Sequence, residues 1–144
     1  STFRAVSERD LERLHHLCPV ETRIGDDIKA TRCLSADQQK AAEGVRLLQA
    51  IDTADHVVLL DEHGQQWSSV EFAARLQKRM ASGLRRLVMV IGGPYGFSPD
   101  VYARANGLMS LSRMTFNHEM VRLIFAEQLY RAFTILNHEP YHHE

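Results

Sequence analysis

The sequence predicts an α/β fold in which a mostly parallel sheet carries helices on both faces. Two runs, "HVVLL" (56–60) and "LVMVI" (87–91), are apolar almost throughout, which is typical of strands buried on both faces of a parallel sheet. Stretches with helix caps and helical spacing alternate with these runs along the chain. With 144 residues, 44% of them hydrophobic and 24% charged, the chain is expected to form one domain over residues 1–144.

The first expected elements are a helix and a strand. Ser7 and Asp10 are spaced to cap a helix, and Pro19 would end it. The alternating residues of "VETRI" (20–24) are typical of a half-buried strand.

A second helix and the first buried strand follow. Ser35 and Gln38 form a capping-box pattern, which predicts a helix through "QQKAAEGVRLLQAI" (38–51). "HVVLL" is then expected to be a central strand. "DEHG" (61–64) predicts a turn directly after it.

The third expected helix begins at another capping box, made by Ser68 and Glu71. Gly83 is suited to its end because glycine accepts the left-handed backbone that often terminates a helix. The side chains expected to face the core are Phe72, Leu76 and Met80. "LVMVI" is the next buried strand and leads directly into "GGPYG" (92–96).

The last part of the chain predicts two helices and one strand. Ser98 and Pro99 suit the N-cap and first turn of a short helix, "LMSLS" (108–112) is a third strand, and a long helix runs from about Asn117 to Leu136. Apolar residues cover more of the long helix than one core-facing stripe needs. A second buried face is therefore expected, and the simplest partner is a twin subunit.

Composition limits the classes of protein. No apolar run is long enough to span a membrane, and no signal peptide is recognisable. The only two cysteines, Cys18 and Cys33, exclude a disulfide framework and lack metal-ligand spacing. We therefore expect a cytoplasmic protein with reduced thiols.

The net charge of −1 is unevenly divided along the chain. Residues 1–68 hold 8 Lys or Arg and 12 Asp or Glu, whereas residues 69–144 hold 9 and 6. This asymmetry permits an anionic partner at the C-terminal half without requiring one.

Three strand ends lead into loops that can hold a ligand: "LLDEHG", "IGGPYG" and "LSRMTF". The glycines of "GGPYG" would let a ligand approach the backbone, but a plain strand-to-helix turn would use the same residues. The spacings GxGxxG and GxxxxGK[ST] are absent from the sequence. Any cofactor must therefore be held in another way.

The tail "NHEPYHHE" (137–144) is rich in histidine for a chain terminus. A metal site using His138, His142 and His143 is one interpretation, and simple exposure is the other. Glu127 and Arg131, four residues apart on the long helix, are either a solvated pair or a partly buried functional pair.

Residues 90–144, "VIGGPYGFSPDVYARANGLMSLSRMTFNHEMVRLIFAEQLYRAFTILNHEPYHHE", closely resemble the ribosomal RNA large-subunit methyltransferase H family of the SPOUT class. The segment "VVLLDEHGQQWSSVEFAARLQ" also resembles that family, so the resemblance covers about residues 34–144. The first thirty residues match less well, and the first strand typical of the family is expected to be absent.

The resemblance implies a SPOUT-type sheet with a C-terminal trefoil knot, a homodimer, and S-adenosylmethionine bound mainly by backbone groups of the three loops. Leu60, Leu111 and Phe116 would supply apolar walls for adenine. The cofactor-binding positions carried over are Leu59, Leu60, Asp61, Gly92, Gly93, Pro94, Ser110, Leu111, Ser112, Arg113, Met114, Thr115 and Phe116. No metal is implied.

The family methylates N3 of a pseudouridine in 23S rRNA within the assembled ribosome. The catalytic positions carried over are Tyr141, His142, His118 and Glu127. Tyr141 is expected to stack on or position the base, and His142 to act as base or proton relay. The tail would then fold over a cofactor pocket, completing the site of the partner subunit.

Contacts with RNA are expected at Arg122, Arg131 and His143, with Arg113 as a further candidate. Many relatives carry arginine where this chain has His143, so that contact would be weaker here. Two other functions stay open. One is a ribosome-binding SPOUT module that binds the cofactor but is catalytically impaired, and the other is a metal-dependent hydrolase using the tail histidines.

Overall fold

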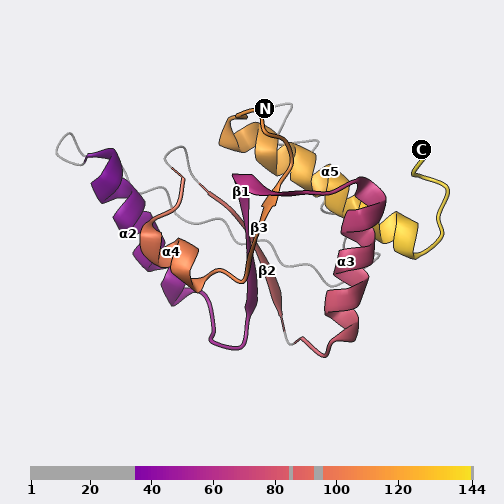
Figure 1. Cartoon of the computed structure of the whole chain (residues 1–144), viewed down its shortest axis with the longest axis horizontal. Coiled ribbons are helices and arrows are strands. Elements are labelled where there is room, and N and C mark those ends of the chain that lie inside the picture. The colour runs from indigo at the N-terminus through magenta and orange to yellow at the C-terminus, as the bar shows by residue number, and fades with distance from the viewer. Residues whose placement is uncertain (1–34, 85, 93–95, 144) are drawn as a thin grey trace.

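The computed structural model describes residues 35–84, 86–92 and 96–143 (Figure 1). The helix expected after Ser7 and the strand expected at 20–24 lie outside the described residues. The expectation that the first strand of the family is absent also concerns residues outside the described part. Among the described residues, no helix is both long and apolar enough to cross a membrane.

A parallel sheet of three strands forms the centre of the described structure. Its strands are β1 (His56–Gln66), β2 (Leu87–Ile91) and β3 (Gly107–Ser110), in the order β2-β1-β3. Both neighbours pair with β1 in the parallel sense. The parallel sheet predicted from the apolar runs is therefore confirmed in this part of the chain.

In the described part of the chain, four helices cover the two faces of this sheet. They are α2 (Ala36–Gln49), α3 (Ser69–Ala81), α4 (Pro99–Arg104) and α5 (His118–Leu136). Figure 1 shows α2 and α4 on one side of the strands and α3 and α5 on the other. The prediction of helices on both faces is confirmed.

The predicted starts of α2, α3 and α5 are also confirmed. Ser35 and Gln38 make both hydrogen bonds of a capping box at α2, and Ser68 and Glu71 do the same at α3. The Asn117 side chain accepts a hydrogen bond from the Met120 backbone at 2.9 Å and caps α5. These bonds satisfy backbone donors that a helix start leaves free.

Alternate residues of the strands enter two separate hydrophobic cores. Val57, Leu59 and Val90 pack with α4 and the end of α2, whereas Leu60 and Met109 pack with α3 and α5. This follows from the two-residue period of a strand, which sends successive side chains to opposite faces.

The turn predicted at 61–64 is wrong, because β1 continues to Gln66. Leu60 and Gln65 both pair with Met109, so the four residues between them form a bulge in the strand. A Cβ on Gly64 would lie 2.6 Å from backbone atoms of Leu108 and Met109. Glycine is therefore required here because the backbones of β1 and β3 approach closely, and not because the chain turns.

Two further details differ from the expectations. Met80, predicted to face the core, is 47% exposed, because Phe72, Ala73 and Leu76 form the buried stripe of α3 and Met80 lies in its last turn. β3 ends at Ser110, so Leu111 and Ser112 belong to the following loop. The end of α3 is as predicted, since Gly83 has a φ of 79°.

The long helix α5 has no exposed residue between Met120 and Leu136. Phe125 and Ala132 belong to the core beneath α3, whereas Ala126 and Phe133 are buried on an adjacent side of the helix. A second buried face is therefore present within a single chain, and the apolar surface of α5 does not by itself require a twin subunit.

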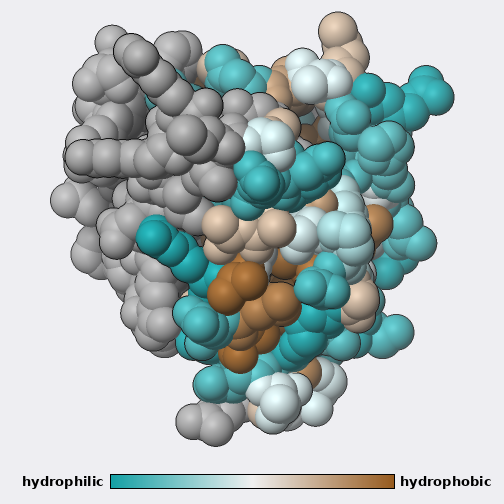
Figure 2. Space-filling model, turned by 90° about the vertical axis from the view of Figure 1, so that its left-hand side faces the viewer, coloured by the Kyte–Doolittle hydropathy of each residue, from teal (hydrophilic) through white to brown (hydrophobic). Residues whose placement is uncertain are grey.

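The outer surface beside α2 and α4 is mainly hydrophilic. Figure 2 shows one small group of hydrophobic atoms there, surrounded by polar residues. Val45 of α2 is 56% exposed. Small apolar groups are commonly exposed on protein surfaces.

Candidate active site

A cavity of about 650 Å³ lies beyond the carboxyl ends of the three strands. It is lined by the bulge of β1, the residues after β2, the loop after β3 and the start of α5. The structure thus brings together the three loops that the sequence singled out. The cofactor-binding candidates that line it are Leu60, Asp61, Gly92, Ser110, Leu111, Ser112, Met114, Thr115 and Phe116.

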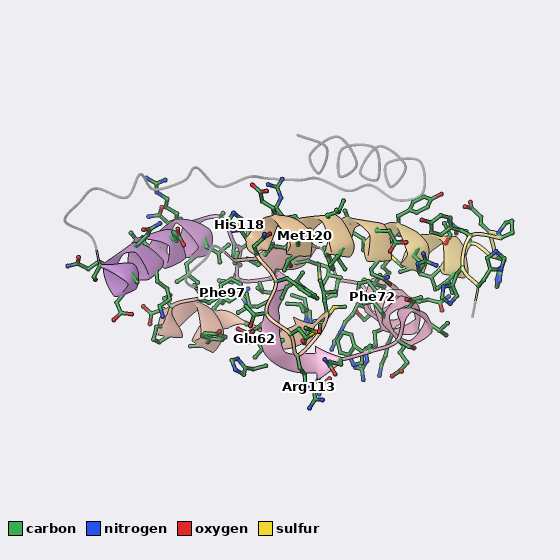
Figure 3. All side chains as sticks on the ribbon, turned by 90° about the horizontal axis from the view of Figure 1, so that it is seen from above. Glu62, Phe72, Phe97, Arg113, His118 and Met120 are labelled. Atoms are coloured by element: carbon green, nitrogen blue, oxygen red, sulfur yellow. The ribbon has the colours of Figure 1, made fainter. Side chains whose placement is uncertain are left out.

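Two of the remaining candidates for cofactor binding are described and do not line this cavity. Leu59 is fully buried in the core on the α2 side of the sheet. Arg113 lines a neighbouring hollow of about 490 Å³ that shares Glu62, His63 and Thr115 with the cavity. Figure 3 shows Arg113 extending away from α5. Gly93 and Pro94 are outside the described residues.

One wall of the cavity was not predicted from the sequence. It is built by Phe97 and Tyr102, whose rings meet edge to face with centroids 5.8 Å apart. A Cβ on Gly92 would lie 2.9 Å from the Phe97 ring, so this glycine is needed for packing of the wall itself. No sequence motif marks these aromatic residues, of which Phe97 precedes α4 and Tyr102 lies within it.

Asp61 is the most buried charged group of the cavity, with its side chain only 9% exposed. Its carboxylate accepts hydrogen bonds from the Tyr102 hydroxyl and from the His63 backbone N–H, the latter at 2.8 Å. Burial acts to raise the pKa of Asp61, but these hydrogen bonds outweigh it and hold that pKa below its ordinary value. Burial and the hydrogen bond to Asp61 raise the pKa of Tyr102 to about 12.

The described residues that line the cavity include two carboxylates and two imidazoles. Asp61 and Glu62 contribute carboxylates, His63 and His118 contribute imidazoles, and the described lining includes neither Lys nor Arg. The Thr115 hydroxyl donates to Glu62 at 2.6 Å, which ties the loop after β3 to the bulge of β1. The cavity therefore favours a cation over an anion.

The predicted catalytic residues fall into two groups. His118, the first residue of α5, lines the cavity. Glu127, Tyr141 and His142 gather around Arg131, toward the other end of the same helix. Figure 1 shows the C-terminus beyond that far end, away from the loops at the start of α5.

This second group, which we call the tail cluster, consists of Glu127, Tyr130, Arg131, Tyr141 and His142. Arg131 donates from Nε and Nη2 to Oε1 of Glu127, at 3.0 and 2.6 Å. The Tyr141 hydroxyl donates to the same oxygen at 3.2 Å. The side chains of Arg131 and Glu127 are 24% and 27% exposed, so this ion pair is partly buried rather than solvated.

The tail is held against α5 by further contacts. Arg131 Nη1 lies 3.1 Å from His142 Nδ1, and because a guanidinium only donates, this ring nitrogen is the acceptor. The Tyr141 ring packs edge to face on Tyr130 at 4.8 Å and lies 4.8 Å from the Arg131 guanidinium carbon. The hydrogen bond to Glu127 raises the pKa of Arg131 above its ordinary value.

A single chain does not bring the tail to its own cavity. At about 1.5 Å of rise per residue, roughly 20 Å of helix separates His118 from Arg131. Among the expected RNA contacts, Arg131 is engaged by Glu127, Arg122 is half-buried on α5, and His143 is exposed. Within the described residues, no three His, Cys, Asp or Glu side chains gather as metal ligands.

Comparison with known proteins identifies the class first. Residues 1–142 match the family described as "Predicted SPOUT methyltransferase". The chain belongs to this family of methyl-transferring enzymes.

The names of similar proteins indicate a particular kind of methyltransferase. The chain is 57% identical over 132 residues to the ribosomal RNA large subunit methyltransferase H of Christiangramia forsetii, covering 92% of the chain and 84% of that protein. It is 54% identical over 138 residues to the protein of that name from Porphyromonas gingivalis, covering 96% and 88%. The predicted family is confirmed, and the similarity begins at residue 1 rather than near residue 34.

Proposed function

We propose that this methyltransferase transfers the methyl group of S-adenosylmethionine to N3 of a pseudouridine in 23S rRNA, within the assembled ribosome. The name of the relatives supports a large-subunit rRNA substrate. The family resemblance supports the particular base and the assembled ribosome, and ribosomes as substrate would place the protein in the cytoplasm.

The charge of the cavity is the observation that carries this proposal. S-adenosylmethionine supplies an electrophilic methyl group on a positively charged sulfonium. Two carboxylates and the absence of Lys and Arg from the described lining suit such a cation and oppose phosphate-bearing cofactors. The volume of about 650 Å³ also suits a small molecule, and Leu60, Leu111 and Phe116 give apolar surface for a flat base.

We further propose that the chain works as a homodimer with a C-terminal trefoil knot, in which each tail completes the cavity of the other subunit. The arrangement of α5 supports this proposal, because the tail cluster and the cavity of one chain lie near opposite ends of the helix. Residues from both groups act on one base only if a second chain brings them together.

The residues of the cavity and of the tail cluster have different roles in the proposed methyl transfer. The cavity holds the donor in line with the attacking nitrogen, which supplies much of the rate. His142 takes the N3 proton after its Nδ1 leaves Arg131, and Tyr141 positions the base. Glu127 fixes Arg131 and the Tyr141 hydroxyl, so it acts through these two side chains. His118 is the candidate proton acceptor on the cavity side.

Docking to RNA depends on the ribosome in this proposal. A net charge of −1 gives little general attraction to phosphate. Arg113, Arg122 and His143 are the proposed local contacts, while Arg131 supports the tail cluster. Free RNA should therefore be a poor substrate compared with ribosomes.

The test measures methyl transfer from radiolabelled S-adenosylmethionine to ribosomes from a strain without its own enzyme of this family. Label is expected in large-subunit rRNA, and Tyr141→Ala and His142→Ala should each reduce the rate roughly 100-fold or more. His138→Asn is the matched control, since His138 is exposed, has a φ of 57° that asparagine tolerates, and belongs to the same tail.

Two results would contradict the proposal. Bound cofactor with no label in ribosomes would favour the ribosome-binding module over the enzyme. Unchanged rates in both tail variants would remove Tyr141 and His142 from catalysis.

A further inference from the structure

The carboxylate of Asp61 carries a negative charge that the described part of the chain does not balance with Lys or Arg. Its side chain is 9% exposed and lines the cavity. Among the described residues, its only ion-pair partner is the ring of His63, which is 80% exposed and 3.1 Å away. A charge this far removed from water interacts strongly with any ion that enters the cavity.

Besides the His63 ring nitrogen, two neutral donors bind this carboxylate. Tyr102 donates its hydroxyl from α4, and the backbone N–H of His63 donates from the bulge of β1. Tyr102 is in turn packed edge to face on Phe97. Because both donors are neutral, they hold the carboxylate without cancelling its charge.

We propose that Asp61 is the countercharge that makes the cavity select a sulfonium methyl donor over its neutral thioether product. This inference rests on the proposed use of S-adenosylmethionine. Tyr102 donates one hydrogen bond to this carboxylate and contributes no charge of its own. The consequence is a site that binds the donor more tightly than S-adenosylhomocysteine and releases the product once the charge is gone.

The charge balance of the reaction explains the selectivity. The pyrimidine N3 gives its electron pair to the new N–CH₃ bond, and the electron pair of the broken S–CH₃ bond stays on sulfur. The sulfur therefore changes from a cation to a neutral thioether, while the N3 proton goes to the base. Attraction to Asp61 is lost in the same step.

Calorimetric titration without RNA tests this proposal. The wild type should bind S-adenosylmethionine roughly tenfold more tightly than S-adenosylhomocysteine, and Asp61→Asn should bring the two affinities to within about twofold of each other. Tyr102→Phe is the matched control because it removes a hydrogen bond to Asp61 and leaves the charge. It should retain most of the preference.

Sinefungin provides a measurement that needs no variant, since it carries a protonated amine where the donor has its sulfonium. The wild type should bind it more tightly than S-adenosylhomocysteine. Equal losses for donor and product in Asp61→Asn would overturn the inference, because Asp61 would then contact a part that both molecules share. A preference lost equally in Tyr102→Phe would also overturn it.

A different result of the same titration would contradict the proposed function. A folded wild type that binds none of the three molecules would contradict the proposed cofactor. Equal binding of all three would contradict only the role of Asp61.

Discussion

Each end of the sheet has an aspartate with a largely buried side chain, but the two aspartates have different charged partners. Asp55 directly precedes β1, and Asp61 lies six residues later, in the bulge of the same strand. The side chains are 1% and 9% exposed, so each is removed from water. Only Asp55 has an arginine as partner, and the cavity lies at the end where Asp61 has none among the described residues.

The amino end of the sheet is closed by a polar network. Arg86 donates from Nε to Asp55 at 3.0 Å and from Nη2 to the other oxygen of the same carboxylate. Arg104 donates to the backbone carbonyls of Asp52 and Asp55, each at 2.9 Å, and Asn106 accepts from the Val57 N–H at 2.8 Å. The hydrogen bond from Arg86 holds the pKa of Asp55 below its ordinary value.

The difference between the ends separates stability from binding. At the amino end, each charge meets a charge or a carbonyl of the same chain, which stabilises the fold. At the carboxyl end, Asp61 accepts from a phenol and a backbone N–H, and its ion-pair partner among the described residues is the exposed ring of His63. In our proposal, the charge of Asp61 meets a ligand. We expect substitutions at the first end to change the free energy of unfolding and those at the second to change binding.

The largest effect on unfolding is expected for Arg86→Met. This substitution leaves the buried Asp55 carboxylate without its partner and should lower the free energy of unfolding by about 3 kcal/mol, measured by urea denaturation. Lys78→Met, an exposed position on α3, is the control and should stay within about 0.5 kcal/mol of wild type. A similarly small change for Arg86→Met would show that the pair does not stabilise the fold.

A smaller effect is expected when the carboxyl end is distorted through its backbone. Gly64→Ala places a Cβ 2.6 Å from the backbone of β3, so we expect a loss of about 2 kcal/mol together with weaker cofactor binding. Gly107→Ala is the matched control on β3, because its nearest such atom, in Val58, is 4.0 Å away. Equal effects of the two substitutions would mean that the bulge tolerates displacement.

The smallest effect concerns the ionisation of Tyr102. Its pKa is raised from 10.0 to about 12, so the protonated phenol contributes stability below pH 10 that is lost as pH rises through 12. Asp61→Asn removes the charge beside it and should move this ionisation toward 10, as measured by the ultraviolet absorbance of the phenolate and compared with Tyr102→Phe. No movement would show that burial alone raises the pKa.

Local signals in the sequence predicted most of the described elements. The capping boxes at Ser35 and Ser68 marked two helix starts correctly, because a cap is satisfied by residues only three positions away. The turn predicted at 61–64 failed for the opposite reason. Whether that segment turns or bulges depends on contact with β3, more than forty residues later.

The candidate site was predictable in part. Strand ends in a parallel sheet meet at one edge, so the three loops were expected to converge, and they do. Phe97 and Tyr102 were missed because an aromatic residue beside a short helix gives no sign of the wall it forms. The position of the tail cluster followed only from the length and direction of α5.

The sequence by itself determined the family, the parallel α/β fold and the caps that start the helices, since these depend on neighbouring residues or on motifs that relatives share. Tertiary structure alone decided that Asp55 meets Arg86 while Asp61 meets Tyr102, and that His118 and the tail cluster lie apart. The physical reason is that charge and burial depend on which distant residues the fold brings together. Two aspartates six positions apart look alike in the sequence and differ only in those neighbours.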